Sequence, residues 1–247
     1  MEEQGGVNQF SLQRLDFRSV VKRRTEAVRN FKLFSEIPAD ECEQIIAAAH
    51  EQRYPKGKTI FFEGDSVRQV ILLTSGAVKL VQSNLNGDET IVRLVGPGEM
   101  LCFEGFINST QCATASAIEA ATALVWEAGQ FQTARDCFAV LGRNVADLLQ
   151  QALTQLEVRF REVSTEKVNL RLSSQLLRLS SQVGKPADGH VEIGLSQRDL
   201  AQLTGTTIFT VSRLLTRWET QGIVAPRREA VRVLDMLGLR NLSEFND

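Results

Sequence analysis

The sequence predicts an α+β fold made of an N-terminal antiparallel β-roll, one long helix and a C-terminal winged helix-turn-helix. Three observations support this prediction. Short β-type runs separated by glycine fill residues 31–130, and an apolar repeat with steps of three and four covers residues 131–163. Two short amphipathic helices with a glycine between them lie in residues 164–247, and a basic extension of residues 1–30 precedes everything else.

Composition excludes several classes of protein. The chain has 247 residues, of which 43% are hydrophobic and 23% charged, as expected for one or two domains with cores of their own. No run of about 18 apolar residues is long enough for a membrane span, and the N-terminus lacks the apolar core of a signal peptide. We therefore expect a cytoplasmic protein with no membrane partner.

Metal and catalytic sites are not expected either. Cysteines stand at positions 42, 102, 112 and 137 without a CxxC pair, and there are only two histidines. Closely spaced cysteines or histidines are what a zinc site or an iron-sulfur cluster needs. The chain also lacks a phosphate-binding glycine motif and an evident nucleophile with its base, so we expect no enzyme activity.

The N-terminal extension carries an excess of basic side chains over Asp16 and Glu26. A cationic arm of this kind fits contacts with DNA phosphates or with RNA polymerase. The alternative is a poorly ordered or packing helix peculiar to this protein. The basic residues are Arg14, Arg18, Lys22, Arg23, Arg24 and Arg29.

The roll is predicted by the glycine-punctuated runs KGKTIFFEGD, QVILLTSGAVKLVQ, NLNGDETIVRLVGPGEM and QCATASAIEAATALVW. The tetrapeptide NGDE fits a hairpin turn, with Asn86 and Gly87 suited to positive φ. Short strands at this spacing are typical of a small antiparallel roll or barrel.

The long helix is predicted from a nearly glycine-free segment. Its apolar residues recur over about three to four heptads, as in a coiled coil, and a helix of about 30 residues spans about 45 Å. A second copy of the chain is the simplest cover for this seam, so we expect a homodimer; the alternative is that the seam packs on its own roll. The predicted seam residues are Phe138, Leu141, Val145, Leu148, Ala152 and Leu156, with Phe160 and Val163 beyond them.

A joint is expected near residues 164–167, where Ser164 or Thr165 can cap a new helix. Apolar residues follow at positions 168, 172, 176 and 179, which gives that helix one buried face. The segment GKPADGH then predicts a loop, and VEIGL predicts a short strand.

The helix-turn-helix is predicted from LSQRDLAQLTGTTIFTVSRLLTRWETQGIV. Ser196 with Asp199 three residues on forms a capping box, and Gly205 suits the tight turn before a second helix that begins at about Thr206. One face of the second helix is apolar and must meet a core, through Val211, Leu214, Leu215 and Trp218. The opposite face presents threonines, a phenylalanine and arginines, with no carboxylate before Glu219.

A two-stranded wing is predicted by GIVAPRREAVRVLD, which follows the second helix. Local charge matters more here than the net charge of −2. Between residues 195 and 234 the carboxylates are Asp199, Glu219 and Glu229, and the cations outnumber them. These cations are Arg198, Arg213, Arg217, Arg227, Arg228 and Arg232.

In their order along the chain, these motifs resemble the cyclic-AMP receptor protein and fumarate-nitrate reduction regulator (CRP/FNR) family of bacterial transcription factors. The resemblance rests on FSEIPADECEQI, YPKGKTIFFEGD, LLTSGAVKLV, GPGEM and the helix-turn-helix segment. It implies a cyclic-nucleotide-binding-like roll, a dimerisation helix and two heads that enter successive major grooves of double-stranded DNA about 34 Å apart. An effector in the roll would set the orientation of the heads through the joint.

The resemblance also implies which residues meet DNA. The family's run of Glu, Thr, a hydrophobic residue, Ser and Arg aligns with residues 209–213, so Ser212 and Arg213 match while Phe209 replaces the acidic residue. A phenyl ring cannot accept a hydrogen bond from cytosine but can contact a thymine methyl, so we expect an altered half-site. The alternative is that Phe209 leans back on the wing. The expected DNA-binding residues are Ser196, Gln197, Thr206, Thr207, Phe209, Thr210, Ser212, Arg213, Arg217 and Arg228.

The effector is less defined. Cyclic-nucleotide binders of the family place an Arg-Ser pair where this chain has Gln111 and Cys112, so cyclic AMP bound in the usual way is disfavoured although Glu99 is present. Cys102 occupies the place of a haem-ligating cysteine in carbon-monoxide sensors, but Glu104 stands where they have a histidine. The expected effector-pocket residues are Glu99, Leu101, Cys102, Phe103, Gln111 and Cys112.

Several interpretations stay open at this stage. Cys102 fits a buried structural thiol, a haem ligand or a redox-sensing thiol. An iron-sulfur cluster is not expected, because no cysteine group precedes Cys42. The effector is therefore an unidentified small molecule or gas. A ligand-binding interaction module that does not bind DNA is the alternative from another functional class.

Overall fold

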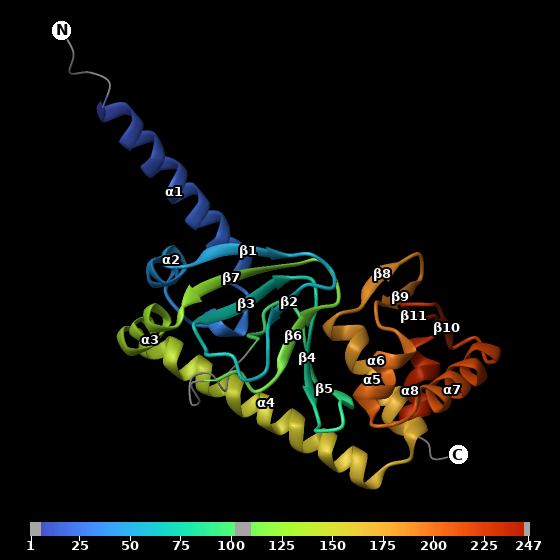
Figure 1. Cartoon of the computed structure of the whole chain (residues 1–247). Helices are drawn as coiled ribbons and strands as arrows, with labels where there is room; N and C mark the ends of the chain where they lie inside the picture. Colours follow the sequence, from blue (N-terminus) through green and yellow to red (C-terminus); the bar gives the residue numbers. More distant parts are fainter. Residues whose placement is uncertain (1–5, 102–109, 245–247) are drawn as a thin grey trace.

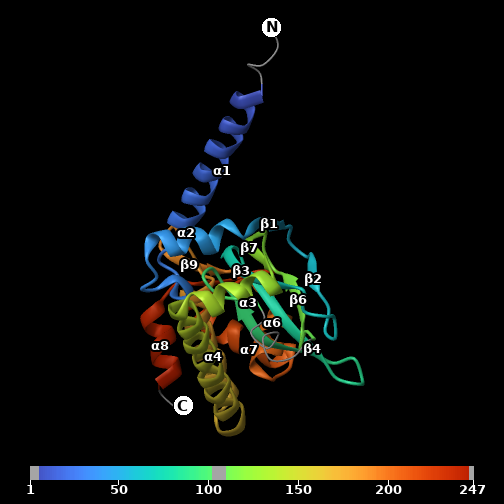
Figure 2. The ribbon, with the colours of Figure 1, turned by 90° about the vertical axis from the view of Figure 1, so that its left-hand side faces the viewer.

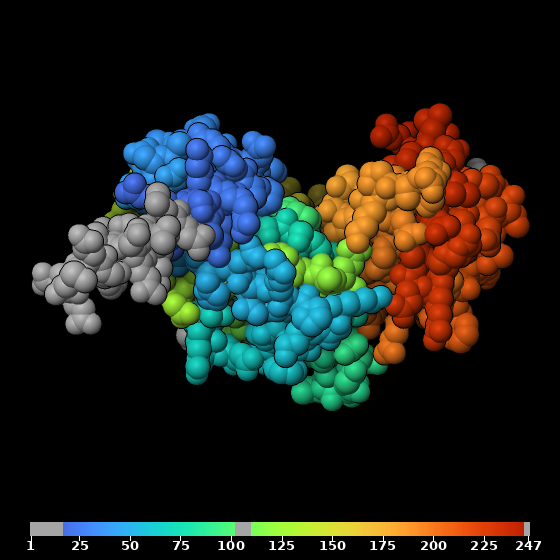
Figure 3. All heavy atoms as spheres, turned by 90° about the horizontal axis from the view of Figure 1, so that it is seen from above, coloured from blue at the N-terminus to red at the C-terminus, as the bar shows by residue number. Residues whose placement is uncertain are grey.

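The computed structural model describes residues 6–101 and 110–244, with side chains from residue 17 onward. Figure 1 shows the roll at the centre, helix α4 running along it and the C-terminal domain beside it. The space-filling view in Figure 3 shows the roll and the C-terminal domain as adjoining bodies. Cys102 and Phe103, which the sequence places in the effector pocket, lie outside the described residues.

The basic N-terminal segment forms helix α1 (Gly6–Val28), followed by the short helix η1 (Lys32–Phe34) and helix α2 (Ala39–Ala47). The C-terminal end of α1 is anchored, because Val21 and Val28 are buried in a core with Phe34. The rest of α1 projects away from the roll (Figures 1 and 2).

The roll consists of two antiparallel sheets that enclose an apolar core. One sheet has the strand order β1-β7-β3 and the other β2-β6-β4-β5. The strand residues that face the interior, such as Leu73, Val78 and Ala115, are buried. The strands are β1 (His50–Tyr54), β2 (Thr59–Phe61), β3 (Gln69–Ser75), β4 (Val78–Ser83), β5 (Glu89–Val95), β6 (Thr114–Ala117) and β7 (Ala121–Glu127).

Two glycines show why the roll needs this residue at its turns. Gly87 has φ 83° in the predicted hairpin between β4 and β5, whereas Asn86 does not have positive φ, contrary to the expectation for it. Asn84 stabilises this turn through its side-chain oxygen, which accepts from the backbone N–H groups of Asn86 and Asp88, both at 2.9 Å. At Gly76, a Cβ atom would lie 2.3 Å from the carbonyl oxygen of Ala120.

The prediction of one helix from residue 131 is wrong, because the chain forms two. Helix α3 (Ala128–Cys137) ends at Phe138, whose backbone is extended with φ −111° and ψ 94°, and α4 (Ala139–Thr165) follows. The bend lets Phe131 of α3 and Leu141 of α4 enter the same apolar core. A single straight helix through residues 128–165 would carry Phe131 away from the core that Leu141 enters.

The first half of the predicted dimer seam is also misplaced. Leu141, Val145 and Leu148 are buried within their own subunit, in the core that holds the N-terminal helices. The Asn144 side chain stabilises the packing of α4 on the N-terminal segment by donating to the carbonyl oxygens of Leu33 at 3.0 Å and Ser35 at 2.8 Å. These three seam residues are therefore packed within their own chain, against the N-terminal helices and the roll.

Further along α4, the apolar residues face outward. Four of them remain at least half exposed and follow steps of three and four, so they share one side of the helix. We call this set the α4 stripe: Leu153 (57% exposed), Leu156 (59%), Phe160 (74%) and Val163 (50%).

The joint between α4 and α5 (Val168–Gln182) falls at Glu166 and Lys167, within the expected segment. The expectation that Ser164 or Thr165 caps α5 is wrong. The Thr165 hydroxyl donates to the carbonyl oxygen of Arg161 at 2.8 Å, inside α4, and the N-cap position of α5 is Lys167 with no side-chain hydrogen bond. As expected, α5 buries Leu172, Leu176 and Leu179.

The C-terminal domain adds a four-stranded antiparallel sheet, in the order β10-β11-β9-β8, to its helices. The segment predicted as a loop contains strand β8, which pairs with β9 because Asp188 and Gly189 both adopt positive φ in the turn between them. The elements are β8 (Lys185–Ala187), β9 (His190–Ile193), α6 (Gln197–Thr204), α7 (Ile208–Thr220), β10 (Val224–Pro226), β11 (Val231–Val233) and α8 (Met236–Glu244).

Two findings concern membranes and metals. None of the described helices combines the length and the apolar character of a membrane span. Within residues 6–101 and 110–244, no three histidine, cysteine or acidic side chains gather in a way that would hold a metal ion.

Candidate nucleic-acid interface and effector region

The turn between α6 and α7 is held by local chemistry. The Ser196 hydroxyl accepts from the backbone N–H of Asp199 at 3.1 Å, and the Asp199 carboxylate accepts from the Ser196 backbone N–H at 3.1 Å. Two N–H groups at the start of α6 that have no partner within the helix are thereby satisfied. Gly205 then ends α6 in the left-handed conformation, with φ 60° and ψ 46°, as the tight turn requires.

Helix α7 begins two residues later than expected, at Ile208. The Thr207 side chain is its N-cap and accepts from the backbone N–H of Thr210 at 3.2 Å. Val211, Leu215 and Trp218 are buried, so the apolar side of α7 faces the domain core as predicted.

The opposite side of α7 is open to solvent. Phe209 is 83% exposed, so it does not lean back on the wing. Arg213 and Arg217 are exposed one helical turn apart, and no ion pair involves either of them among the described residues. Ile208, which was not predicted as a DNA-binding residue, is 44% exposed beside Phe209. This surface is therefore cationic and apolar together.

The hydroxyl groups near α7 differ in availability. Thr207 is exposed, while Thr206, Thr210 and Ser212 are half-buried. The hydroxyl oxygens of Thr207 and Thr210 lie 3.1 Å apart, so each occupies part of the other's hydrogen-bonding capacity. These two residues first of all stabilise the start of the helix.

The predicted wing forms between β10 and β11 and presents Arg228 to solvent at its tip. The turn closes through a hydrogen bond from the Arg227 N–H to the Ala230 carbonyl oxygen at 2.8 Å. Arg232 is not part of the free cationic surface, because its guanidinium pairs with Glu192 at 2.7 Å. Beside Arg228, Glu229 pairs with Lys56 of the roll at 2.8 Å.

The start of α6 lies against the roll. The Lys79 ammonium on β4 is 2.7 Å from the Asp199 carboxylate. Burial raises the pKa of Asp199, but the hydrogen bonds from Lys79 and Ser196 outweigh it and hold that pKa below its ordinary value. Ser196 and Gln197, both expected to meet DNA phosphates, are therefore half-buried at this contact.

Of the expected effector-pocket residues that the structure describes, Leu101 and Cys112 share the core of the roll, whereas Glu99 and Gln111 lie apart from each other. Glu99 accepts hydrogen bonds from the Gly96 N–H at 2.8 Å and from the Gln182 side chain at 2.9 Å, so it faces the C-terminal domain. Leu101 is buried in the roll core. Gln111 is buried at a cavity between β2 and β3 that neither Glu99 nor Leu101 lines. Its Oε1 atom has no hydrogen-bond partner among the described residues. Cys112, half-buried, follows it.

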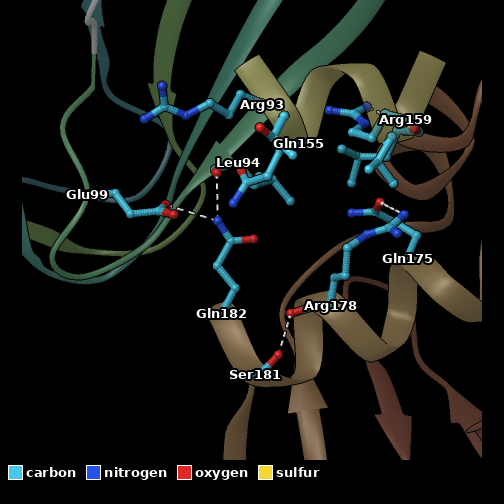
Figure 4. Close-up of a pocket in the computed structure, with 12 residues that line it drawn as sticks. Arg93, Leu94, Glu99, Gln155, Arg159, Gln175, Arg178, Ser181 and Gln182 are labelled. Carbon is cyan, nitrogen blue, oxygen red and sulfur yellow. Dashed lines mark hydrogen bonds between the residues drawn. The ribbon is translucent and has the colours of Figure 1, made fainter. Parts of the chain in front are cut away.

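A cavity of about 390 Å³ lies where the roll, α4 and the C-terminal domain meet. Figure 4 shows Arg93 and Glu99 of the roll, Arg159 of α4 and Arg178 of α5 around it. Of these four residues, Glu99 is the one that the sequence predicted for a site. Arg159 and Arg178 could not be singled out from the sequence, because arginines are usually exposed. The structure shows that α4 and α5 turn these two side chains towards the cavity.

Comparison with protein families gives two matches. Residues 51–136 match the model of the cyclic nucleotide-binding domain, and residues 170–242 match the Crp-like helix-turn-helix domain. Together these segments take in most of the roll and nearly the whole C-terminal domain.

Individual relatives agree with these matches. A cyclic AMP receptor protein of Thermus thermophilus is 28% identical over 193 residues, covering 78% of this chain and 87% of that protein. The transcriptional regulatory protein btr of Bordetella pertussis is 25% identical, covering 83% and 86% respectively. The structure of FixK2 from Bradyrhizobium japonicum superposes with a TM-score of 0.70 at 21% identity, over 81% of this chain and 99% of that one.

Proposed function

Because the chain belongs to the CRP/FNR family of DNA-binding transcription regulators, which are not enzymes, we propose that it acts as a homodimer whose roll senses an effector. The effector would set the orientation of two helix-turn-helix heads on a near-palindromic operator. The observation that supports this proposal best is the outer side of α7, where Arg213 and Arg217 stand beside an exposed Phe209. A helix held by its apolar side and open on its cationic side suits the major groove.

Dimer formation is supported by the α4 stripe. Exposed apolar side chains at heptad spacing on a helix favour pairing with a second helix of the same kind. Burying one such side chain stabilises an assembly by about 1.5–3 kcal/mol. Four of them on each of two chains therefore offer enough apolar surface for a stable pair, provided that the helices meet along this side.

The contacts between roll and C-terminal domain support an orientation switch. Lys79 with Asp199 and Lys56 with Glu229 are ion pairs across the boundary, and the Glu166–Lys167 joint is the covalent hinge. A ligand can shift such an equilibrium only if it binds the two orientations with different affinity. Cyclic AMP in the usual position is not favoured, since Gln111 and Cys112 replace the Arg-Ser pair. Haem or a redox-active thiol at Cys102 remains the alternative effector chemistry.

The basic face of α1 is a second surface for partners. Arg18, Lys22 and Arg23 are exposed on a helix that projects from the roll (Figure 2). Their charge fits either DNA phosphates or an acidic surface of RNA polymerase.

A DNA titration tests the proposed function. Operator candidates selected from random duplex DNA should bind a dimer, and log K should fall steeply and linearly with log salt, because each phosphate contact releases counterions. Sedimentation of the same samples gives the number of chains per duplex. An affinity that does not change with salt, or no selection of any sequence, would favour the interaction module that does not bind DNA.

Phe209 is expected to change the operator. Replacing Phe209 with Glu should shift selection towards a cytosine at the position facing residue 209, because a carboxylate accepts from the cytosine amino group and a phenyl ring cannot. A good contact of this kind discriminates by about 1–3 kcal/mol. Site selection with each variant measures the preference at every base pair. Phe209→Leu is the matched control, since it keeps an apolar side chain, and identical selected sites for all three proteins would contradict the prediction.

A further inference from the structure

The cavity between the roll, α4 and the C-terminal domain has the lining of a ligand site. Its volume of about 390 Å³ falls in the range of small-molecule pockets. From the arrangement of Arg159 and Arg178 against apolar walls, we propose that it binds a small organic anion with an apolar body. Anion binding by the cavity does not depend on the proposed function. Its expected effect on DNA affinity does rest on that function.

Arg159 is the main reason to expect an anion. Its guanidinium donates to the carbonyl oxygens of Val92, Ile91 and Leu203, so its partners are neutral. No carboxylate lies within ion-pair distance of it in the described parts of the chain. Burial and then the neighbouring Arg178 lower the pKa of Arg159, and the Glu162 carboxylate opposes this shift without reversing it. A half-buried cation whose hydrogen-bond partners are all neutral is incompletely compensated, so an anionic ligand would be stabilised beside it.

Arg178 presents a second cation to the cavity. Two of its nitrogens donate to the Glu162 carboxylate at 2.6 and 2.8 Å, which fixes the guanidinium plane. Its Nε atom is buried without a hydrogen-bond partner among the described residues. Among the described residues, Arg93, Arg159, Arg178 and the carboxylate of Glu99 line the cavity, and Glu162 pairs with Arg178 beside it.

The remaining walls define the rest of the ligand. Leu94, Val158 and Leu203 line the cavity with apolar surface, and Gln155 and Gln182 add amide groups. A ligand with a phosphate or carboxylate head and a short apolar body satisfies both kinds of wall. A fully polar ion would leave the apolar walls in contact with water.

Occupation of the cavity would tie three parts of the molecule together. Arg159 belongs to α4, Arg178 to the first helix of the C-terminal domain and Leu94 to the roll (Figure 4). A ligand that touches all three favours the orientation seen here over any orientation that opens the cavity. It is therefore an effector site separate from the interior of the roll.

Phenyl phosphate is a suitable probe, with phenol as its neutral counterpart. Calorimetric titration of the full chain should show saturable binding of one phenyl phosphate per chain and none of phenol. Arg159→Met should weaken binding by about tenfold or more, as expected for losing a charge-assisted hydrogen bond. Val158→Trp should abolish binding by filling the cavity while leaving every arginine in place. Arg161→Met, exposed two residues along the same helix, should bind like the unmodified protein.

The outcomes separate this site from the proposed function. The anion site would be overturned if phenyl phosphate did not bind saturably. It would also be overturned if the Arg159→Met and Val158→Trp variants melted like the unmodified protein and bound phenyl phosphate with the same affinity as that protein. Neither outcome depends on whether the protein binds DNA. If the site holds, saturating phenyl phosphate should change the affinity for selected DNA by about fivefold or more, within the range of typical allosteric coupling. An unchanged DNA affinity would overturn its regulatory consequence.

Discussion

Replacing Leu156 and Phe160 together with aspartate should convert the protein into a monomer and weaken operator binding about 100-fold or more. The change puts four carboxylates into one interface where apolar contact is expected, and each lost apolar side chain removes about 1.5–3 kcal/mol. A monomer also loses the second head, which binds at a high effective concentration once the first is seated.

Sedimentation equilibrium and DNA titration measure the two consequences separately. The control is Leu85→Asp, which replaces an equally apolar but fully exposed residue at the tip of the β4–β5 hairpin. The control should remain dimeric and bind DNA normally. If the double variant stayed dimeric, the α4 stripe would not be the interface.

Arg213→Ala should reduce affinity for the selected operator by about 30-fold or more and relax the preference at one base pair of each half-site. A bidentate arginine contact with guanine contributes about 1–3 kcal/mol of discrimination, and a dimer uses two of them. Because Arg213 is exposed and makes no ion pair among the described residues, its removal should leave the fold unchanged.

Competition titrations with specific and nonspecific duplexes distinguish base contact from phosphate contact. Loss of a base contact lowers specific binding alone, whereas loss of a phosphate contact lowers both and reduces the salt slope by about one for each contact, or about two in a dimer. Arg240→Ala, on the exposed side of α8, is the matched control. Unaltered specific affinity in Arg213→Ala would show that α7 does not read the operator through this residue.

The sequence determined those features that depend on neighbouring residues. The capping box of Ser196 and Asp199, the left-handed turn at Gly205 and the buried side of α7 were all predictable. Each one is decided within about four residues along the chain, through a hydrogen bond, a backbone angle or helical spacing. The division into roll, helix and winged domain was predictable for the same reason.

Only the tertiary structure decided where the α4 helix begins, which of its apolar residues stay exposed, and that Arg159 and Arg178 meet at a cavity. Steps of three and four look the same whether a helix side faces its own core, as at Leu148, or solvent, as at Phe160. Burial is settled by segments distant in sequence: the N-terminal helices cover the start of α4 and leave its end open. Spacing shows that a side is apolar, whereas its partner depends on long-range packing.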